Sequence, residues 1–250
     1  MNNPLDTLNT LEDTAAFICT KLKENGIDVV LSGGSCMEIY THKNFSSYDI
    51  DFIANPSYTT KRISEVMVAL GFKKVDGRYY KYDNNPNYIE FPTGPVSLGN
   101  ELPKKFDELK TLVGTLVLLT PTDCIKDRLC AFVYHGGKEC FHQAMAVAHL
   151  NAINMSNLKR WAKNESKEMK NILKHFITDF KLLKKIVITS VDIKKYLQQK
   201  AKSSYLNLAN NNDLETLKDD LFGDYVLRQL LDIKNDSEYY SKVDSFLKNL

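Results

Sequence analysis

The chain has 250 residues and a formal net charge of +2, with 43% hydrophobic and 26% charged residues, as is typical of a globular protein. It contains no long apolar run and no basic-then-apolar leader at its start, which excludes a transmembrane helix or signal peptide and favours a cytoplasmic protein with no membrane partner. The five cysteines form no Cys-x-x-Cys pair, which favours reduced thiols and disfavours a zinc site.

The first part of the chain alternates between helical and strand-like patterns. Apolar residues at helical spacing predict a helix over 5–24, which Gly26 ends. A strand over 27–32 then runs into the small-residue turn Gly33-Gly34-Ser35 and a helix over 35–41. The next predicted strand, 48–54, opens with Asp49-Ile50-Asp51.

The middle of the chain continues the alternation. We predict a helix from residue 59 or 60 to Leu70, strands near 72–75, 78–82 and 87–91, a loop over 93–110, a strand over 112–119, and helices over 121–133 and 138–151. Asp76-Gly77 predicts a hairpin turn between the first two of these strands.

Beyond residue 156 the pattern is helical throughout. We expect helices over 156–186, with a break near His175, and over 190–202, 212–221 and 223–247. The predicted fold class is therefore α+β, with a mixed sheet and flanking helices in a first domain (1–152) and a helical bundle in a second (153–250).

The acidic triplet of the second strand carries the strongest chemical signal. Side chains alternate along a strand, so Asp49 and Asp51 share one face and Ile50 points to the other. Two neighbouring carboxylates repel each other unless a cation or proton joins them. A divalent metal carrying a nucleoside triphosphate would fit, with the phosphates at Gly33, Gly34 and Ser35. The alternative is an ordinary turn followed by a solvated charge pair.

This order of strand, Gly-Gly-Ser turn, helix and Asp-x-Asp strand resembles the nucleotidyltransferases of the DNA polymerase β superfamily. Within it, the first 150 residues or so resemble the AbiEii-type family of type IV toxin–antitoxin systems. The resemblance rests on three segments, 31–35, 48–52 and 121–129. It implies a nucleotidyltransferase-like fold and a two-metal transfer mechanism that uses Mg²⁺ or Mn²⁺ and an NTP substrate.

The resemblance also implies a third carboxylate and a basic phosphate contact. Glu90, in a strand-like run, is the candidate for the third metal ligand. The alternatives are that Glu90 faces water on an edge strand, as Pro92 suggests, or that Asp83 takes its place. Lys126 is the implied phosphate contact.

Arg128 lies two residues beyond Lys126, which turns the two side chains roughly 200° apart on a helix. We expect Arg128 to support the nucleotide site by pairing with Asp49, Asp123 or Asp127. For Lys126, a solvated helix face with intrahelical ion pairs is the alternative.

The sequence therefore predicts an enzyme that transfers a nucleotide from NTP to an acceptor hydroxyl or phosphate. RNA or tRNA, a protein and a small molecule are the candidate acceptors, and a toxin role would add a cognate antitoxin partner. The lysine-rich stretch 151–210 suits a nucleic-acid acceptor, or is a solvated helix face. The alternative function is a non-catalytic nucleotide- or RNA-binding module regulated by a protein partner.

Overall fold

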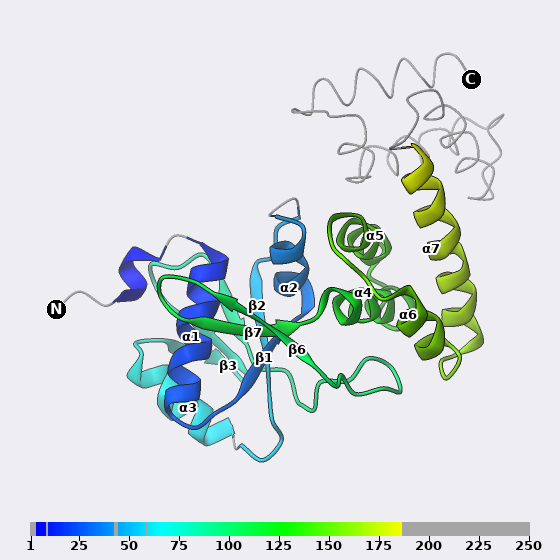
Figure 1. Cartoon of the computed structure of the whole chain (residues 1–250). Helices are drawn as coiled ribbons and strands as arrows, with labels where there is room; N and C mark the ends of the chain where they lie inside the picture. The colour runs from blue at the N-terminus through cyan, green and yellow to red at the C-terminus, as the bar shows by residue number, and fades with distance from the viewer. Residues whose placement is uncertain (1–3, 9, 43–44, 59, 187–250) are drawn as a thin grey trace, which may run out of the picture. The chain divides into compact units, whose positions relative to one another are not determined.

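The computed structural model describes residues 4–8, 10–42, 45–58 and 60–186, with side chains as far as residue 181 (Figure 1). The chain divides into two units, Met1–Lys170 and Asn171–Leu250. The first unit therefore extends beyond the predicted boundary at residue 152. The reason is visible at the helix Met155–Ala162 (α6), where the indole of Trp161 donates a hydrogen bond of 2.7 Å to the Leu98 carbonyl. Most of the predicted helical bundle lies outside the described residues.

The described part of the chain contains one seven-stranded sheet, in the order β3-β4-β5-β2-β1-β7-β6. Its strands are β1 Val29–Ser32, β2 Asp49–Ala54, β3 Lys73–Asp76, β4 Tyr79–Lys81, β5 Tyr88–Glu90, β6 Phe106–Lys110 and β7 Thr115–Leu119. The pairs β2–β5 and β1–β7 are parallel and the other pairs are antiparallel. The predicted mixed sheet with flanking helices is confirmed.

Helices cover both faces of this sheet. The described helices are α1 Leu11–Glu24, α2 Gly33–Tyr40, α3 Thr60–Ala69, α4 Pro121–His135, α5 Cys140–Leu150, α6 and α7 Lys167–Ile186, and a 3₁₀ turn at Pro4–Thr7 precedes α1. Figure 1 shows α1 and α3 on one side of the strands and α2 with α4 and α5 on the other. None of the described helices is long and apolar enough to cross a membrane.

Local sequence signals explain where the main helices begin and end. Thr120 caps α4 by accepting a hydrogen bond of 3.2 Å from the Asp123 amide, and Pro121 occupies the first turn. Gly136, with a φ of 72°, ends the same helix. The Asp76-Gly77 turn joins β3 to β4, so the predicted hairpin is confirmed.

The core lies where alternate strand residues meet the α1 and α3 side of the sheet. Ile50 of β2, Ile89 of β5 and Tyr80 of β4 lie in register with one another and are fully buried. Phe52, two residues beyond Ile50, stacks on Phe91 with ring centroids 6.1 Å apart. Burial of this face fixes the strand register and, with it, the residues on the opposite face.

Three predictions about secondary structure are wrong. The segment 93–110 is not only loop, because its end forms β6, whose exposed Phe-Asp-Glu-Leu-Lys run pairs with β7 at the sheet edge. The helix predicted over 156–186 is interrupted between α6 and α7, and the break predicted near His175 is absent, because this residue lies inside α7.

The five cysteines, all within the described residues, are buried and form no disulfide.

Candidate functional site

Strand register brings the three predicted acids to the same part of the sheet. Asp49 and Asp51 alternate along β2 with the buried Ile50. The parallel neighbour β5 places Glu90 directly beside Asp51. Because β5 lies between β4 and β2, Glu90 is on an interior strand and only 8% exposed, so the edge-strand alternative is wrong. Asp83 instead lies on the exposed β4–β5 connection, paired with Lys73.

The glycine turn lies against the same acids. Antiparallel pairing of β1 with β2 sets Ser32 opposite Asp51, and α2 begins at the next residue. Gly33 has a φ of +69°, and a Cβ atom at this position would overlap the Asp51 carboxylate. A Cβ at Gly34 would lie 2.9 Å from the Ser47 hydroxyl. Gly33 is therefore required twice, for the backbone conformation and for the close approach of Asp51.

Ser35 has a different role from the one predicted for its hydroxyl. The buried Oγ donates a hydrogen bond of 3.1 Å to the Ser32 carbonyl. It also accepts one of 3.4 Å from the Asp51 amide. The hydroxyl is engaged within the protein, where it fixes the start of α2 to β2, and this geometry does not direct it at a phosphate.

Burial and neighbouring carboxylates raise the pKa values of the two aspartates. Burial, followed by the charges of Glu90, Asp127 and Asp49, raises the pKa of Asp51 to about 7, and Arg128 opposes the shift. The pKa of Asp49 is also raised, first by burial and then by Glu90, while Lys81 lowers it. The cluster therefore holds more negative charge than its surroundings compensate, which is the condition that favours a bound cation or proton.

Three basic side chains border this acidic cluster. The Nε atom of Arg78 lies 2.5 Å from Oε1 of Glu90. Arg128 pairs with Asp127, its Nη2 atom 2.6 Å from Oδ2, which settles its partner among the three acids left open by the sequence. Lys81 lies near enough to lower the pKa of Asp49. Sequence reasoning missed Arg78 and Lys81, although pairing of the Asp76-Gly77 hairpin with β5 would have brought both beside the acids.

Lys126 lies in another environment. Its side chain is 1% exposed, and its ammonium group pairs with Asp123 at 2.8 Å and Glu101 at 3.0 Å. Glu101 also accepts hydrogen bonds from Arg160. These bonds are the main reason why the pKa of Glu101 falls to about 2. Lys126 and Arg128 therefore have different partners, as expected from their directions on the helix. The predicted phosphate contact of Lys126 is not supported, because its charge is already neutralised by two carboxylates.

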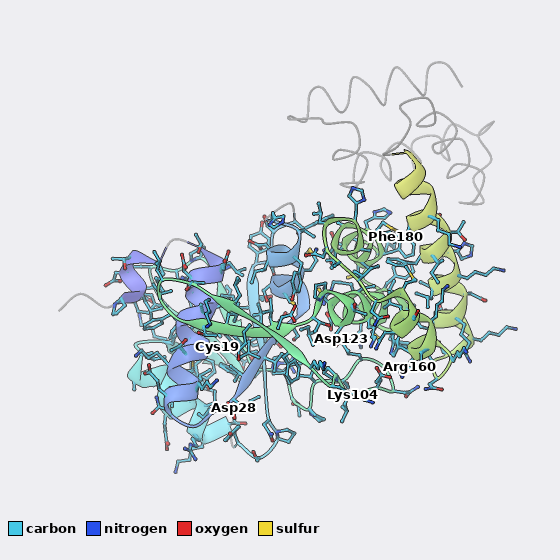
Figure 2. All side chains as sticks on the ribbon, in the orientation of Figure 1. Cys19, Asp28, Lys104, Asp123, Arg160 and Phe180 are labelled. Atoms are coloured by element: carbon cyan, nitrogen blue, oxygen red, sulfur yellow. The ribbon has the colours of Figure 1, made fainter. Side chains whose placement is uncertain are left out.

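This ion-pair network lines a polar cavity of about 760 Å³ beside α4 and α6. Figure 2 labels three of its lining residues, Lys104, Asp123 and Arg160. The acids of β2 and β5 are not among its lining residues. Two basic residues were predicted to bind the nucleotide. Of these, Arg128 is the one whose charge lowers the pKa of Asp51, and Lys126 lines the cavity beside α4 and α6.

The carboxylates fit a magnesium or manganese ion by their chemistry, though not as a complete ligand set. In the described part of the chain, no group of three or more His, Cys, Asp or Glu side chains is arranged to hold a metal ion. One physical reason why Glu90 does not complete such a group is that it forms an ion pair with Arg78. Mg²⁺ commonly takes only one or two protein carboxylates and completes its shell with water and substrate phosphates. Asp49 and Asp51 are suited to that mode.

Comparison with known proteins adds no relative to this picture. No family model, no curated protein and no solved structure matches the chain.

Proposed function

We propose that this protein is a metal-dependent nucleotidyltransferase that moves a nucleotide from an NTP onto an acceptor. The observation that carries the proposal is the approach of Gly33, at the start of α2, to Asp51, with Glu90 in register beside it. A helix start, whose first backbone N–H groups have no partner within the helix, next to a pair of carboxylates combines an anion site with a cation site. A metal-bound triphosphate carries both charges.

In the proposed reaction the acceptor oxygen forms a bond to the α-phosphorus of the NTP. The bond between that phosphorus and the bridging oxygen to the β-phosphate breaks, and pyrophosphate leaves. Mg²⁺ or Mn²⁺, when bound, would stabilise the charge on the attacking and leaving oxygens. Asp49 and Asp51 would hold the cation, and the backbone N–H groups of Gly33 and Gly34 would bind the terminal phosphates.

Glu90 and Arg128 would complete the site. Glu90 would accept the proton of an attacking hydroxyl, which requires that it exchange its ion pair with Arg78 for the acceptor. Arg128, held by Asp127, would offset negative charge near Asp51. The resemblance to the AbiEii-type family extends the proposal to a toxin with a cognate antitoxin, for which RNA, tRNA or a protein would be the acceptor.

The test is transfer of label from each α-³²P-NTP, with Mg²⁺ or Mn²⁺, in the presence of total RNA and cell lysate. We expect one labelled species with the wild type and none with Asp49→Asn or Asp51→Asn. Asp83→Asn is the matched control, because this exposed carboxylate lies outside the cluster and should leave labelling intact. Equal labelling by all four proteins would refute the proposal, and transfer from γ-labelled NTP would indicate a kinase instead.

A second candidate is nucleotide binding without turnover, under control of a protein partner. The ion pair between Arg78 and Glu90 favours it, because it removes the third acid from the metal position. In that case NTP binding would depend on Asp49 and Asp51, no labelled product would form, and Glu90→Gln would leave nucleotide affinity unchanged.

A further inference from the structure

The sheet face that carries the acids continues beyond them onto β5 and β4. Antiparallel pairing sets Tyr79 of β4 opposite Glu90 of β5, and Lys81 opposite Tyr88. The parallel pair β2–β5 sets Tyr88 beside Asp49. Because residues that pair directly across two strands project from the same face of a sheet, all of these side chains share the face of the acidic cluster.

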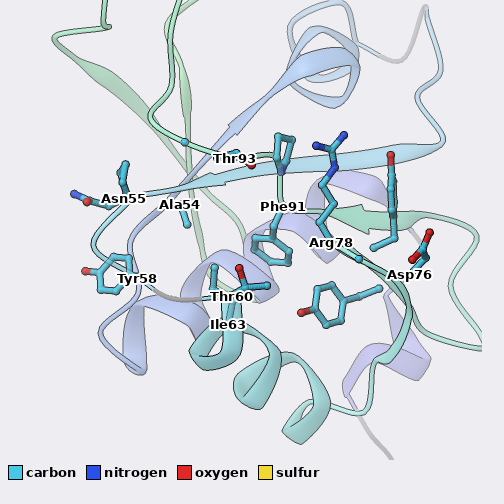
Figure 3. Close-up of a pocket in the computed structure, with 15 residues that line it drawn as sticks. Ala54, Asn55, Tyr58, Thr60, Ile63, Asp76, Arg78, Phe91 and Thr93 are labelled. Atoms are coloured by element: carbon cyan, nitrogen blue, oxygen red, sulfur yellow. The ribbon is translucent and has the colours of Figure 1, made fainter.

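This extension of the face is open to solvent. On the same face α2 packs against β1 and β2, and α4 packs against β7. Beyond these helices Tyr88 is 42% exposed, and Arg78, just before β4, is half-exposed. Figure 3 shows the guanidinium of Arg78 extending away from α3, whereas the ring of Phe91 lies on the side of Ile63 of α3. The outer strands therefore present Tyr88 and Arg78 to solvent next to the acids.

Cationic groups hold two tyrosine rings on this face. The Nζ atom of Lys81 lies over the Tyr88 ring, 4.3 Å from its centroid, and donates a hydrogen bond of 2.6 Å to the Pro86 carbonyl. The guanidinium of Arg78 lies 5.8 Å from the centroid of the Tyr79 ring. These contacts position the rings before a ligand arrives, so that less side-chain entropy is lost on binding.

The charges on this surface favour a ligand with unpaired bases. Within the described residues Lys81 forms no ion pair, but Arg78 is paired with Glu90 and Lys73 with Asp83. A duplex hides the faces of its bases and binds largely through its phosphates, which one unpaired lysine would hold weakly. An unpaired base, in contrast, can stack on an aromatic ring, while a neighbouring cation contacts its phosphate.

We propose that Tyr79, Lys81 and Tyr88 form a platform for a single-stranded nucleic acid, the acceptor of the transferred nucleotide. The inference rests on the proposed function. Tyr79 lies one strand away from Glu90 and Tyr88 one strand away from Asp49, a separation of about 4.8 Å between neighbouring strands. A base stacked on either ring brings the sugar of a terminal nucleotide close to Glu90, the residue proposed to accept the proton of the attacking hydroxyl. The acceptor is then the end of a strand, and not a protein hydroxyl or a small molecule.

The test measures binding of dye-labelled oligonucleotides to the full chain by fluorescence anisotropy, without metal or NTP. The probes are a single strand of RNA, the same sequence as DNA, and the matching RNA duplex. We expect a single strand to bind saturably and more tightly than the duplex. Binding of either kind of strand supports the proposal, and the tighter of the two identifies the acceptor.

Substitutions then locate the binding surface. Tyr79→Ala and Tyr88→Ala should each weaken single-strand binding by about fivefold or more, the loss expected for one stacked base. Tyr88→Phe retains the ring and should keep the affinity within about twofold of the wild type. Phe106→Ala is the matched control and should leave the affinity unchanged, because this residue is 41% exposed and lies on β6, at the far end of the sheet. A thiouridine-substituted strand needs no substitution in the protein and should photo-crosslink to peptides that contain Tyr79 or Tyr88.

Four results would overturn the proposal. They are no saturable binding of any single strand, a duplex that binds as tightly as the single strand, equal affinity in the wild type and Tyr88→Ala, and crosslinks confined to other parts of the chain, such as the lysine-rich stretch 151–210. Asp49→Asn should not weaken strand binding, since it removes negative charge beside the platform. Strand binding without label transfer would refute the proposed reaction alone, and label transfer without strand binding at the platform would refute this inference alone.

Discussion

Replacing Asp51 by asparagine should make the metal-free protein more stable while it abolishes function. The carboxylate lies against Gly33 and beside Glu90, and these surroundings raise its pKa from 3.8 to about 7. At pH 8 the native state must hold this group ionised against burial and like charge. The difference between the pKa of 3.8 and that of about 7 corresponds to roughly 4 kcal/mol. This is the largest increase in the free energy of unfolding that the neutral amide of Asp51→Asn can give.

The pH dependence has a definite sign. Because the pKa of Asp51 is higher in the native state than in the unfolded chain, the native state binds the proton more tightly. The stability that this proton provides is complete below about pH 4, falls as the pH rises toward 7, and is lost above it. The stabilisation by Asp51→Asn should therefore be small at pH 4 and reach its maximum, up to roughly 4 kcal/mol, near pH 8.

The assay is urea unfolding at several pH values in the presence of a chelator. Trp161, the single tryptophan of the chain, is buried in the first unit, so its fluorescence reports the unfolding of that unit. Adding Mg²⁺ at pH 8 should stabilise the wild type and leave Asp51→Asn unchanged, because only the wild type retains both carboxylates. A variant that is less stable than the wild type at pH 8, or a difference that does not vary with pH, would refute the reasoning.

Three further substitutions test other parts of the site. Gly33→Ala should destabilise the protein by clearly more than Gly136→Ala, which has a similar φ of +72° in open space and should cost roughly 1–2 kcal/mol; equal losses in urea unfolding would show that Asp51 does not crowd Gly33. Lys126→Met should cost about 3–5 kcal/mol by leaving buried carboxylates without their cation, whereas the half-exposed Arg160→Met should cost less than about 1 kcal/mol, and similar losses for both would contradict the assignment of Lys126 to a buried network. Glu90→Gln should lower the pKa of Asp51 by removing the like charge that raises it most, so that the pH-dependent loss of stability still begins near pH 4 but is smaller and ends at lower pH; an unchanged curve would place Glu90 outside the cluster.

Local patterns were sufficient to predict the elements that carry the acids. The alternation in Asp49-Ile50-Asp51 gives the face of each side chain, and the apolar neighbours of Glu90 mark it as part of a strand. Register was not predictable from these patterns, because it depends on which strands pair. The contact of Gly33 with Asp51 and the position of Glu90 beside Asp51 follow from register.

Tertiary packing also decided the roles of the basic residues. The helical spacing of Lys126 and Arg128 shows that they diverge, but only the placement of α4 shows which of them lies near Asp51. Arg78 was missed because a hairpin arginine carries no local signal for its partner on β5. β6 was missed because its charged residues are tolerated at an exposed sheet edge, where burial does not impose an apolar pattern.

Crystals soaked with Mn²⁺ and a non-hydrolysable NTP analogue test the central claim most directly. We predict an anomalous peak between the carboxylates of Asp49 and Asp51, with the terminal phosphates bound at the backbone of Gly33 and Gly34. A fully bound analogue with its phosphates elsewhere, or manganese that binds away from these two aspartates, would contradict it.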